Sequence, residues 1–288
     1  MKTKNTRFDE LGRRMKVYEA YTTSLKLLPQ LPIYCRIDGR AFHTFCRGLE
    51  KPFCYELVET MQEVTKFLVE ETHALLGYVQ SDEINLCWQD STKLPFDGKL
   101  FKLESILPSL ATVKFVNYIN YKYNSSKKSD SNEQWKILFN KVQKLNPAFD
   151  CRVFQLPNME ELANCFIWRE TDAVRNSVQM LAQANFSHKD LQGLKTKALQ
   201  DKLLSEKDIN WNNLSDDLKR GAYFKQIFVE KEVDDTTWNK IPDNKKPLSK
   251  TVKRPKVQLV KLPVMKKVEN KTGVYFNNEA PVFYSEEI

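Results

Sequence analysis

The chain has 288 residues, of which 41% are hydrophobic and 28% are charged, with 45 basic residues against 37 acidic ones. A chain of this length can bury one large core or two modest ones. It has no apolar run near the ~20 residues that a membrane span requires, and the opening MKTKNTRFDELGRRMK lacks the apolar centre of a secretory signal. Six scattered cysteines without a C-x-x-C pair favour buried thiols over a zinc site or a disulfide framework. We therefore expect a cytoplasmic protein without a membrane partner.

The first third of the chain predicts a strand, a helix and a hairpin. A charged helix is expected at 13–19, and a buried strand at 32–37, where an apolar run ends in an Asp-Gly pair. A longer helix is predicted over 55–76, with Gly77 as its C-terminal stop. Residues 78–88 alternate as in a hairpin that turns at its central Ser-Asp-Glu. The apolar face of the longer helix comprises Leu57, Met61, Val64 and Leu68, which recur at the helical period.

The middle of the chain predicts two more helices and a strand. An apolar helix is expected within 99–118, and the polar stretch 124–134 is typical of a loop. Residues 149–157 form a strand-like run that a proline ends. Asn158 can cap the helix that follows, with Glu161 in the reciprocal position of a capping box.

The end of the chain is rich in proline and lysine, with short strand-like pieces at 257–262 and 273–276. Residues 240–271 hold 11 basic and two acidic residues, a net charge of +9, whereas residues 1–239 hold 34 basic and 32 acidic ones. This local charge fits a polyanionic partner, and it equally fits a solvated tail that keeps the protein soluble.

The order strand, helix, strand, strand, helix, strand predicts an α+β fold. It describes a ferredoxin-like βαββαβ unit, in which helices cover one antiparallel sheet. The strands that carry positions 38 and 82, which are one strand–helix–strand excursion apart, can lie side by side in such a unit.

Two acids stand at the strand ends of this unit, Asp38 and Asp82. Asp38 precedes Gly39, and Asp-Gly is a common hairpin turn, so one interpretation is simply a turn. The other is a metal site, in which neighbouring carboxylates and the Gly39 carbonyl hold Mg²⁺. Two such ions ~4 Å apart can activate a hydroxyl and neutralise a leaving pyrophosphate. Spacing alone leaves both interpretations open.

The run RIDGRAFHTF, followed by EKPF and SDEI, resembles the signature of the tRNA(His) guanylyltransferase family and its bacterial, archaeal and phage relatives. The resemblance continues through RRMKVYE, FDCRVF, WRETDAVRNS and KRGAYFK, and so covers roughly residues 8–230. It implies an enzyme that adds nucleotides to the 5′ end of RNA, in the 3′–5′ direction, with ATP and GTP as substrates and tRNA as partner. It also implies a polymerase-like palm and a homotetramer. We expect the palm over 1–157, a helical region packed on it over 158–239 and, from the local charge, a basic arm with short strands over 240–288.

The resemblance also assigns roles to single residues. Asp38 and Asp82 match the catalytic carboxylates that bridge two Mg²⁺ ions, and Gly39 matches a carbonyl ligand. Arg36 and Glu83 belong to the motifs in a supporting role. The positions that match nucleotide-binding residues are Arg40, Ala41, Phe42, His43, Lys51, Ser81, Lys99 and Lys102. Candidate RNA contacts are Arg169, Arg175 and Asn176 in the helix, and Lys245, Lys246 and Lys253 in the arm.

One motif departs from the eukaryotic pattern. Those members carry His-Ile-Asn-Asn where this chain has Val174, Arg175, Asn176 and Ser177. The departure favours the branch that adds nucleotides under template direction and repairs 5′-truncated tRNA. Strict addition of a guanosine to tRNA(His), a palm-type nucleotide cyclase and a catalytically silent RNA-binding protein remain as alternatives.

Overall fold

The computed structural model describes residues 6–126, 133–242, 245–247 and 249–284. Within these ranges, strands pair into a six-stranded antiparallel sheet of order β4-β1-β3-β2-β5-β6. The first four strands have the ferredoxin-like order, so the predicted fold class is confirmed. The strands are β1 (Ile33–Gly39), β2 (Leu76–Gln80), β3 (Glu83–Trp88), β4 (Phe149–Gln155), β5 (Ala222–Glu232) and β6 (Thr251–Val260).

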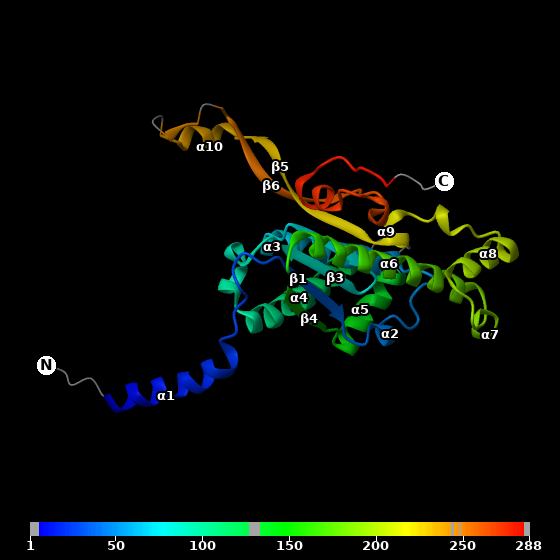
Figure 1. Cartoon of the computed structure of the whole chain (residues 1–288), viewed down its shortest axis with the longest axis horizontal. Coiled ribbons are helices and arrows are strands. Elements are labelled where there is room, and N and C mark those ends of the chain that lie inside the picture. The colour runs from blue at the N-terminus through cyan, green and yellow to red at the C-terminus, as the bar shows by residue number, and fades with distance from the viewer. Residues whose placement is uncertain (1–5, 127–132, 243–244, 248, 285–288) are drawn as a thin grey trace.

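Helices cover both faces of the sheet (Figure 1). On one face α3 (Tyr55–Thr72) and α4 (Leu100–Ser126) pack on Ile33, Cys35 and Ile37, and α5 (Glu133–Leu145) packs on α4. On the other face α6 (Met159–Asn185) packs on residues such as Tyr34. This alternation of side chains along β1 is what a strand buried on both faces requires.

The helix predicted over 55–76 ends earlier, at Thr72, and His73 closes it with a left-handed φ of 53°. Gly77 is therefore not a helix stop but part of β2. A Cβ atom on Gly77 would lie 2.4 Å from the Val69 side chain and 3.1 Å from that of Thr65. The glycine is needed because α3 packs this closely on the sheet.

The other predictions for the middle of the chain are partly confirmed. The helix predicted within 99–118 is α4, which continues to Ser126, and α5 begins at Glu133, so both ends of the predicted loop are helical. Residues 127–132 of that loop lie outside the described residues. Asn158 does cap α6, accepting a hydrogen bond from the Glu161 amide at 2.9 Å, whereas the Glu161 carboxylate accepts from Asn164 instead.

The last third of the chain adds two strands to the palm-like unit. After α7 (His188–Leu191), α8 (Thr196–Lys207) and α9 (Asp216–Arg220), β5 pairs with β2 and then with β6. Beyond the sheet, β5 and β6 continue as a long hairpin that carries α10 (Asp235–Lys240) near its tip and projects from the body (Figure 1). The predicted strand piece at 257–262 overlaps β6.

The predicted strand at 273–276 is wrong, because Gly273–Asn277 forms a helical turn. Consecutive residues of this segment, Val274 and Tyr275, are both buried, which a strand with one buried face cannot achieve. At the other end of the chain, α1 (Thr6–Thr23) contains the predicted helix and extends away from the body (Figure 1). None of the described helices is long and apolar enough to cross a membrane.

Candidate active site

The two predicted catalytic acids meet at one end of the sheet. Strands β1 and β3 are antiparallel neighbours, and their register places Asp38 opposite Glu83. The Gly39 amide donates a hydrogen bond to the Asp82 carbonyl at 3.1 Å. The prediction that the strands bearing these acids lie side by side is therefore confirmed.

A tight turn between β2 and β3 places Asp82. Gln80 pairs with Glu83, so only Ser81 and Asp82 connect the two strands. Ser81 adopts a left-handed φ of 54°, which few residues other than glycine and asparagine adopt readily. Its hydroxyl donates to Asp82 Oδ1 at 3.1 Å, so the turn also orients the carboxylate.

The Asp38–Gly39 pair is not a hairpin turn, so that interpretation is wrong. After Gly39, the chain turns through Arg40 and Ala41 into the short helix α2 (Phe42–Phe45). A Cβ atom on Gly39 would lie 2.4 Å from the Phe42 ring, which is 2% exposed. Glycine at 39 thus allows an aromatic ring to pack directly beneath the end of β1.

Burial and repulsion from neighbouring carboxylates raise the pKa values of the two acids. Burial, and then the nearby charge of Asp38, raise the pKa of Asp82 to about 6. The pKa of Asp38 is raised by burial and then by Glu83 and Asp150, while Arg36 acts in the opposite direction. Two crowded carboxylates of this kind disfavour double ionisation unless a cation lies between them.

The donor set fits a hard divalent cation. Carboxylate and carbonyl oxygens are the ligands that Mg²⁺ prefers, and Asp38, Asp82 and the Gly39 carbonyl supply them at one place. Among the described residues, no group of three or more His, Cys, Asp or Glu side chains could hold a metal. A cation here would therefore need further oxygens from water or from substrate phosphates, which is common for Mg²⁺.

Next to the acids, Glu83 is held by an arginine from α6. Arg169 donates from Nε and Nη2 to the two carboxylate oxygens of Glu83, both at 2.7 Å, and from Nη1 to Asp172 at 2.7 Å. The side chains of Glu83 and Arg169 are only 13% and 14% exposed. Arg175 pairs with the other oxygen of Asp172 but is 58% exposed, and Asn176 is exposed beside it. Of the predicted RNA contacts in α6, Arg169 thus supports Glu83, whereas Arg175 and Asn176 face solvent.

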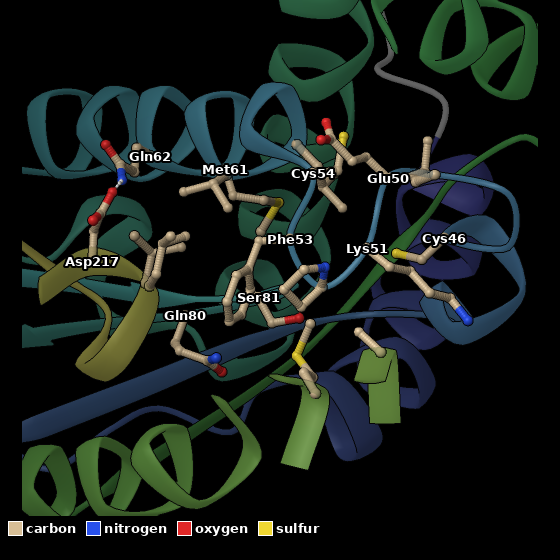
Figure 2. A pocket seen from close by; sticks show the side chains of 18 of the residues that line it. Cys46, Glu50, Lys51, Phe53, Cys54, Met61, Gln62, Gln80, Ser81 and Asp217 are labelled. Carbon is tan, nitrogen blue, oxygen red and sulfur yellow. Dashed lines mark hydrogen bonds between the residues drawn. The ribbon is translucent and has the colours of Figure 1, made fainter. Parts of the chain in front are cut away.

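A cavity of about 240 Å³ opens beside the turn that carries Asp82 (Figure 2). Lys51 and Ser81, both predicted nucleotide-binding residues, line it. Phe53 and Met61 form an apolar wall. Its other polar lining residues include Glu50, Gln62, Gln80, Gln183 and Asp217, which come from the 46–54 loop, α3, β2, α6 and α9.

The remaining predicted nucleotide-binding residues lie in two places. Arg40, Ala41 and His43 are exposed in the segment after β1, whereas the ring of Phe42 is buried, so that only its backbone is available to a ligand. Lys99 directly precedes α4 and forms an isolated antiparallel β-bridge with Lys26, and Lys102 lies in the first turn of α4. Two residues after Lys26, the Leu28 amide donates a hydrogen bond to the Gln155 side chain. Gln155 pairs with Ile33, which begins β1, whereas Asp38 lies at the other end of that strand. The structure does not bring these two lysines together with the acids.

The arm lysines lie on the hairpin. Lys253 is exposed on β6, opposite Glu230 of β5. Lys245 is exposed and Lys246 half-buried in the segment that leads to β6.

Two lining residues at one end of the cavity, Gln62 and Asp217, could not be found from the sequence. Gln62 looks like an ordinary polar position on an amphipathic helix, and Asp217 looks like an acid at a helix start. They are 155 residues apart, and no local pattern indicates that they touch.

Comparisons with known proteins identify the family and support the fold. The model of the tRNAHis guanylyltransferase family matches residues 12–157. A bacterial tRNA(His) guanylyltransferase-like protein solved with ATP is 40% identical, covers 75% of this chain and 88% of its own, and has a TM-score of 0.63. A bacterial protein of the same description solved with GTP is 32% identical, covers 90% and 94%, and has a TM-score of 0.64. The tRNA(His) guanylyltransferase of Schizosaccharomyces pombe is 27% identical, over 77% of this chain and 82% of its own length.

Proposed function

The chain belongs to the tRNAHis guanylyltransferase family, and we propose that it adds nucleotides to the 5′ end of tRNA in the 3′–5′ direction. The observation that carries the proposal is the meeting of Asp38 and Asp82 beside a cavity that contains Lys51 and Ser81. Phosphoryl transfer depends mainly on positioning and charge neutralisation, and this arrangement offers both.

ATP and GTP are the nucleotides proposed for the cavity. Two bacterial relatives were solved with these ligands, and the lining here suits a nucleotide. Lys51 and the nearby acids lie at one end, where a triphosphate with its cations would be neutralised. Phe53 and Met61 supply the apolar contact that a nucleobase needs.

Asp38, Asp82 and the Gly39 carbonyl would hold Mg²⁺. When bound, the cation neutralises phosphate charge and lowers the pKa of a hydroxyl nucleophile. The chain itself preorganises these ligands. Ser81 orients the Asp82 carboxylate, the Gly39 amide fixes the Asp82 backbone, and Arg169 holds Glu83 in an ion pair beside the acids.

The proposed reaction has two transfers at phosphorus. First, a 5′-monophosphate oxygen of the RNA attacks the α-phosphorus of ATP, and pyrophosphate leaves. Second, the 3′-hydroxyl of an incoming nucleotide attacks the activated 5′-phosphorus, the hydroxyl proton is lost, and AMP leaves. Each transfer needs a nucleophile and a leaving group held in line, which a rigid site at a strand end can provide.

We further propose template-directed addition and repair of 5′-truncated tRNA. Val174 stands where eukaryotic members carry a histidine, and it has no donor or acceptor to read a base. Arg175, Asn176, Lys245 and Lys253 face solvent, and Lys246 is half-buried beside Lys245. These side chains suit phosphate contacts that position RNA without reading its sequence.

A homo-oligomer is also part of the proposal. Helix α1 projects from the body and carries exposed apolar side chains. A second copy of the chain could cover these side chains. They include Leu11, Met15, Val17, Tyr18 and Tyr21.

The direct test is incubation of the purified chain with Mg²⁺, labelled ATP and a tRNA that ends in a 5′-monophosphate. Transfer of labelled AMP to the RNA, followed by its release when an incoming nucleotide is supplied, is the expected result. Cyclic AMP as the product would indicate the cyclase alternative. RNA binding without either product would indicate a catalytically silent protein.

A further inference from the structure

One end of the cavity is lined by a hydrogen-bonded pair that the proposed chemistry does not use. Gln62 of α3 donates from Nε2 to Asp217 Oδ2 of α9 at 3.0 Å. Figure 2 shows this pair at one end of the cavity and Lys51 at the other, with Phe53 and Met61 between them. A nucleotide with its phosphates near Lys51 would direct its base toward Asp217.

Asp217 is held in this place by its own helix. The Gly221 amide donates to the Asp217 carbonyl at 3.1 Å. Three residues later, the Arg220 guanidinium forms an ion pair with the buried Glu170 carboxylate at 3.3 Å and donates a hydrogen bond to the Pro263 carbonyl at 3.1 Å. Tyr78 of β2 donates to the Arg220 carbonyl at 2.7 Å. The α9 backbone is thus anchored to the sheet, and Gln62 holds the Asp217 carboxylate that this backbone carries.

The chemistry of the pair indicates what it can recognise. An ionised carboxylate only accepts hydrogen bonds and has about four acceptor positions, of which Gln62 uses one. Hydrogen bonds to a charged group are strong beside apolar walls such as Phe53 and Met61. A ligand that presents N–H groups to this end would satisfy the carboxylate.

We propose that Asp217, held by Gln62, is a specificity-determining residue that accepts hydrogen bonds from the N–H groups on the Watson–Crick edge of a purine nucleotide. Adenine presents its exocyclic amino group there, and guanine presents its ring N–H and its amino group. Gln62 is a positioning residue, because it fixes the carboxylate. This assignment rests on the proposed nucleotide site, since it concerns which base that site accepts.

A purine without such donors should bind poorly. Purine riboside 5′-triphosphate has the same ring and phosphates but no N–H group on that edge, so it would leave the carboxylate desolvated and without a new partner. We expect the wild-type chain to bind ATP and GTP at least about tenfold more tightly than this analogue, which is the effect of one hydrogen bond to a charged group.

The informative variant is Asp217→Asn. Its amide oxygen can still accept from Gln62, but its amide group then presents a donor where the carboxylate presented acceptors. The matched control is Asp216→Asn, the same change one residue earlier. That carboxylate pairs with Lys219 and Arg220, is 58% exposed and is not part of the cavity lining.

The experiment measures equilibrium binding of ATP, GTP and purine riboside triphosphate to the full chain with Mg²⁺. Asp217→Asn should lose the preference for GTP over the analogue, because the new amide donor faces the N–H donors of guanine. The affinity for ATP should not fall in the same way, because N1 of adenine can accept from the amide. Asp216→Asn should keep the wild-type preference. Should Asp217→Asn fail to fold, Gln62→Met serves as the second variant, with a smaller loss of preference expected.

Three results would overturn the assignment. One is an undiminished preference for GTP over the analogue in Asp217→Asn. Another is equal weakening of all three ligands, since a merely structural link between α3 and α9 would affect them alike. The third is equal affinity of the wild-type chain for all three ligands. That result would keep the proposed nucleotide site but would show that Asp217 does not select the base. A wild-type chain that binds none of them contradicts the proposed nucleotide site itself, and this assignment with it.

Discussion

The Gly39 amide donates a hydrogen bond to the Asp82 carbonyl at 3.1 Å. This contact joins the end of β1 to the β2–β3 turn, so that Asp38 and Asp82, which are 44 positions apart in the sequence, lie close together. It brings two carboxylates to one place without any contribution from their side chains. The acids can therefore be changed while the backbone that presents them stays in place.

Replacement of either acid should abolish transfer while the fold persists. Asp38→Ala and Asp82→Ala are each expected to lower Mg²⁺-dependent AMP transfer to RNA by a hundredfold or more, roughly the cost of removing a group that stabilises charge in the transition state. Without Mg²⁺ at pH 7 neither variant should unfold at a lower temperature than the wild type, and Asp82→Ala should unfold at a higher one, because the change removes one of two crowded charges. Asp150→Asn is the control, since Asp150 pairs with Asp38 in register but is exposed on β4. Normal turnover by either alanine variant would contradict the proposed catalytic site.

The metal-free protein should lose stability between pH 4 and 6. The pKa of Asp82 is raised from its ordinary 3.8 to about 6, so the folded chain keeps a proton that the unfolded chain releases. The stabilisation is fully present below about pH 4 and is lost as the pH rises through 6, and a shift of this size corresponds to about 3 kcal/mol.

Urea unfolding in EDTA, at several pH values, measures this effect. The Asp82→Asn variant should lack this part of the pH dependence and should be more stable than the wild type at pH 7. Added Mg²⁺ should stabilise the wild type at pH 7 by mass action but not the variant. Parallel pH curves for the two proteins would contradict the raised pKa.

Arg169 and Arg175 should behave differently although they lie on the same helix. Arg169→Ala leaves the largely buried Glu83 without its partner, so we expect a loss of about 3 kcal/mol of stability and reduced transfer. Arg175→Ala removes an exposed ion pair, which costs little stability. It should instead weaken RNA binding and lower the salt dependence of that binding. Unfolding curves and RNA titrations at several salt concentrations would show whether the two effects separate in this way.

Charge reversal on the arm tests its role in RNA binding. Changing Lys245, Lys246, Lys253 and Lys256 to Glu should weaken RNA binding and flatten its salt dependence, by a slope of up to about 4 if all four contact phosphates. The body should stay folded, because these side chains lie on the hairpin and not in the core. The control is the same number of reversals at the N-cap Lys195 and at the three lysines of α8, Lys197, Lys202 and Lys207. An RNA affinity and a salt slope that both match the wild type would mean that the arm is only a solvated tail.

Addition should follow the template base rather than the identity of the tRNA. A tRNA that lacks its first 5′ nucleotide should receive the nucleotide that pairs with the opposing base, so a change of that base from C to U should switch addition from G to A. The reason is that Val174 cannot read a base and Arg175 suits a phosphate. The assay compares truncated tRNAs of several identities with all four opposing bases. Strong preference for tRNA(His), or addition of G whatever the opposing base, would support the strict guanylyltransferase alternative.

The order of strands and helices in the palm could be predicted because it depends on local periodicity. Apolar residues at the helical spacing identify α3, an apolar run identifies β1, and the Asn158 cap identifies the start of α6. Once the order is known, the ferredoxin-like topology makes β1 and β3 neighbours, and this places Asp38 beside Asp82. The resemblance to a known family rests on the residues around those same strand ends.

The tertiary structure alone decided which distant side chains touch. Gly39 and Gly77 are glycines because Phe42 and Val69 pack against them, and Val274 and Tyr275 lie in a helical turn because both are buried. The ion pair of Glu83 with Arg169 and the hydrogen bond of Gln62 with Asp217 join residues 86 and 155 positions apart. Periodicity shows which face of an element is apolar, but not which element covers that face. Contacts of this kind therefore depend on how the elements pack, and a local sequence pattern carries no information about them.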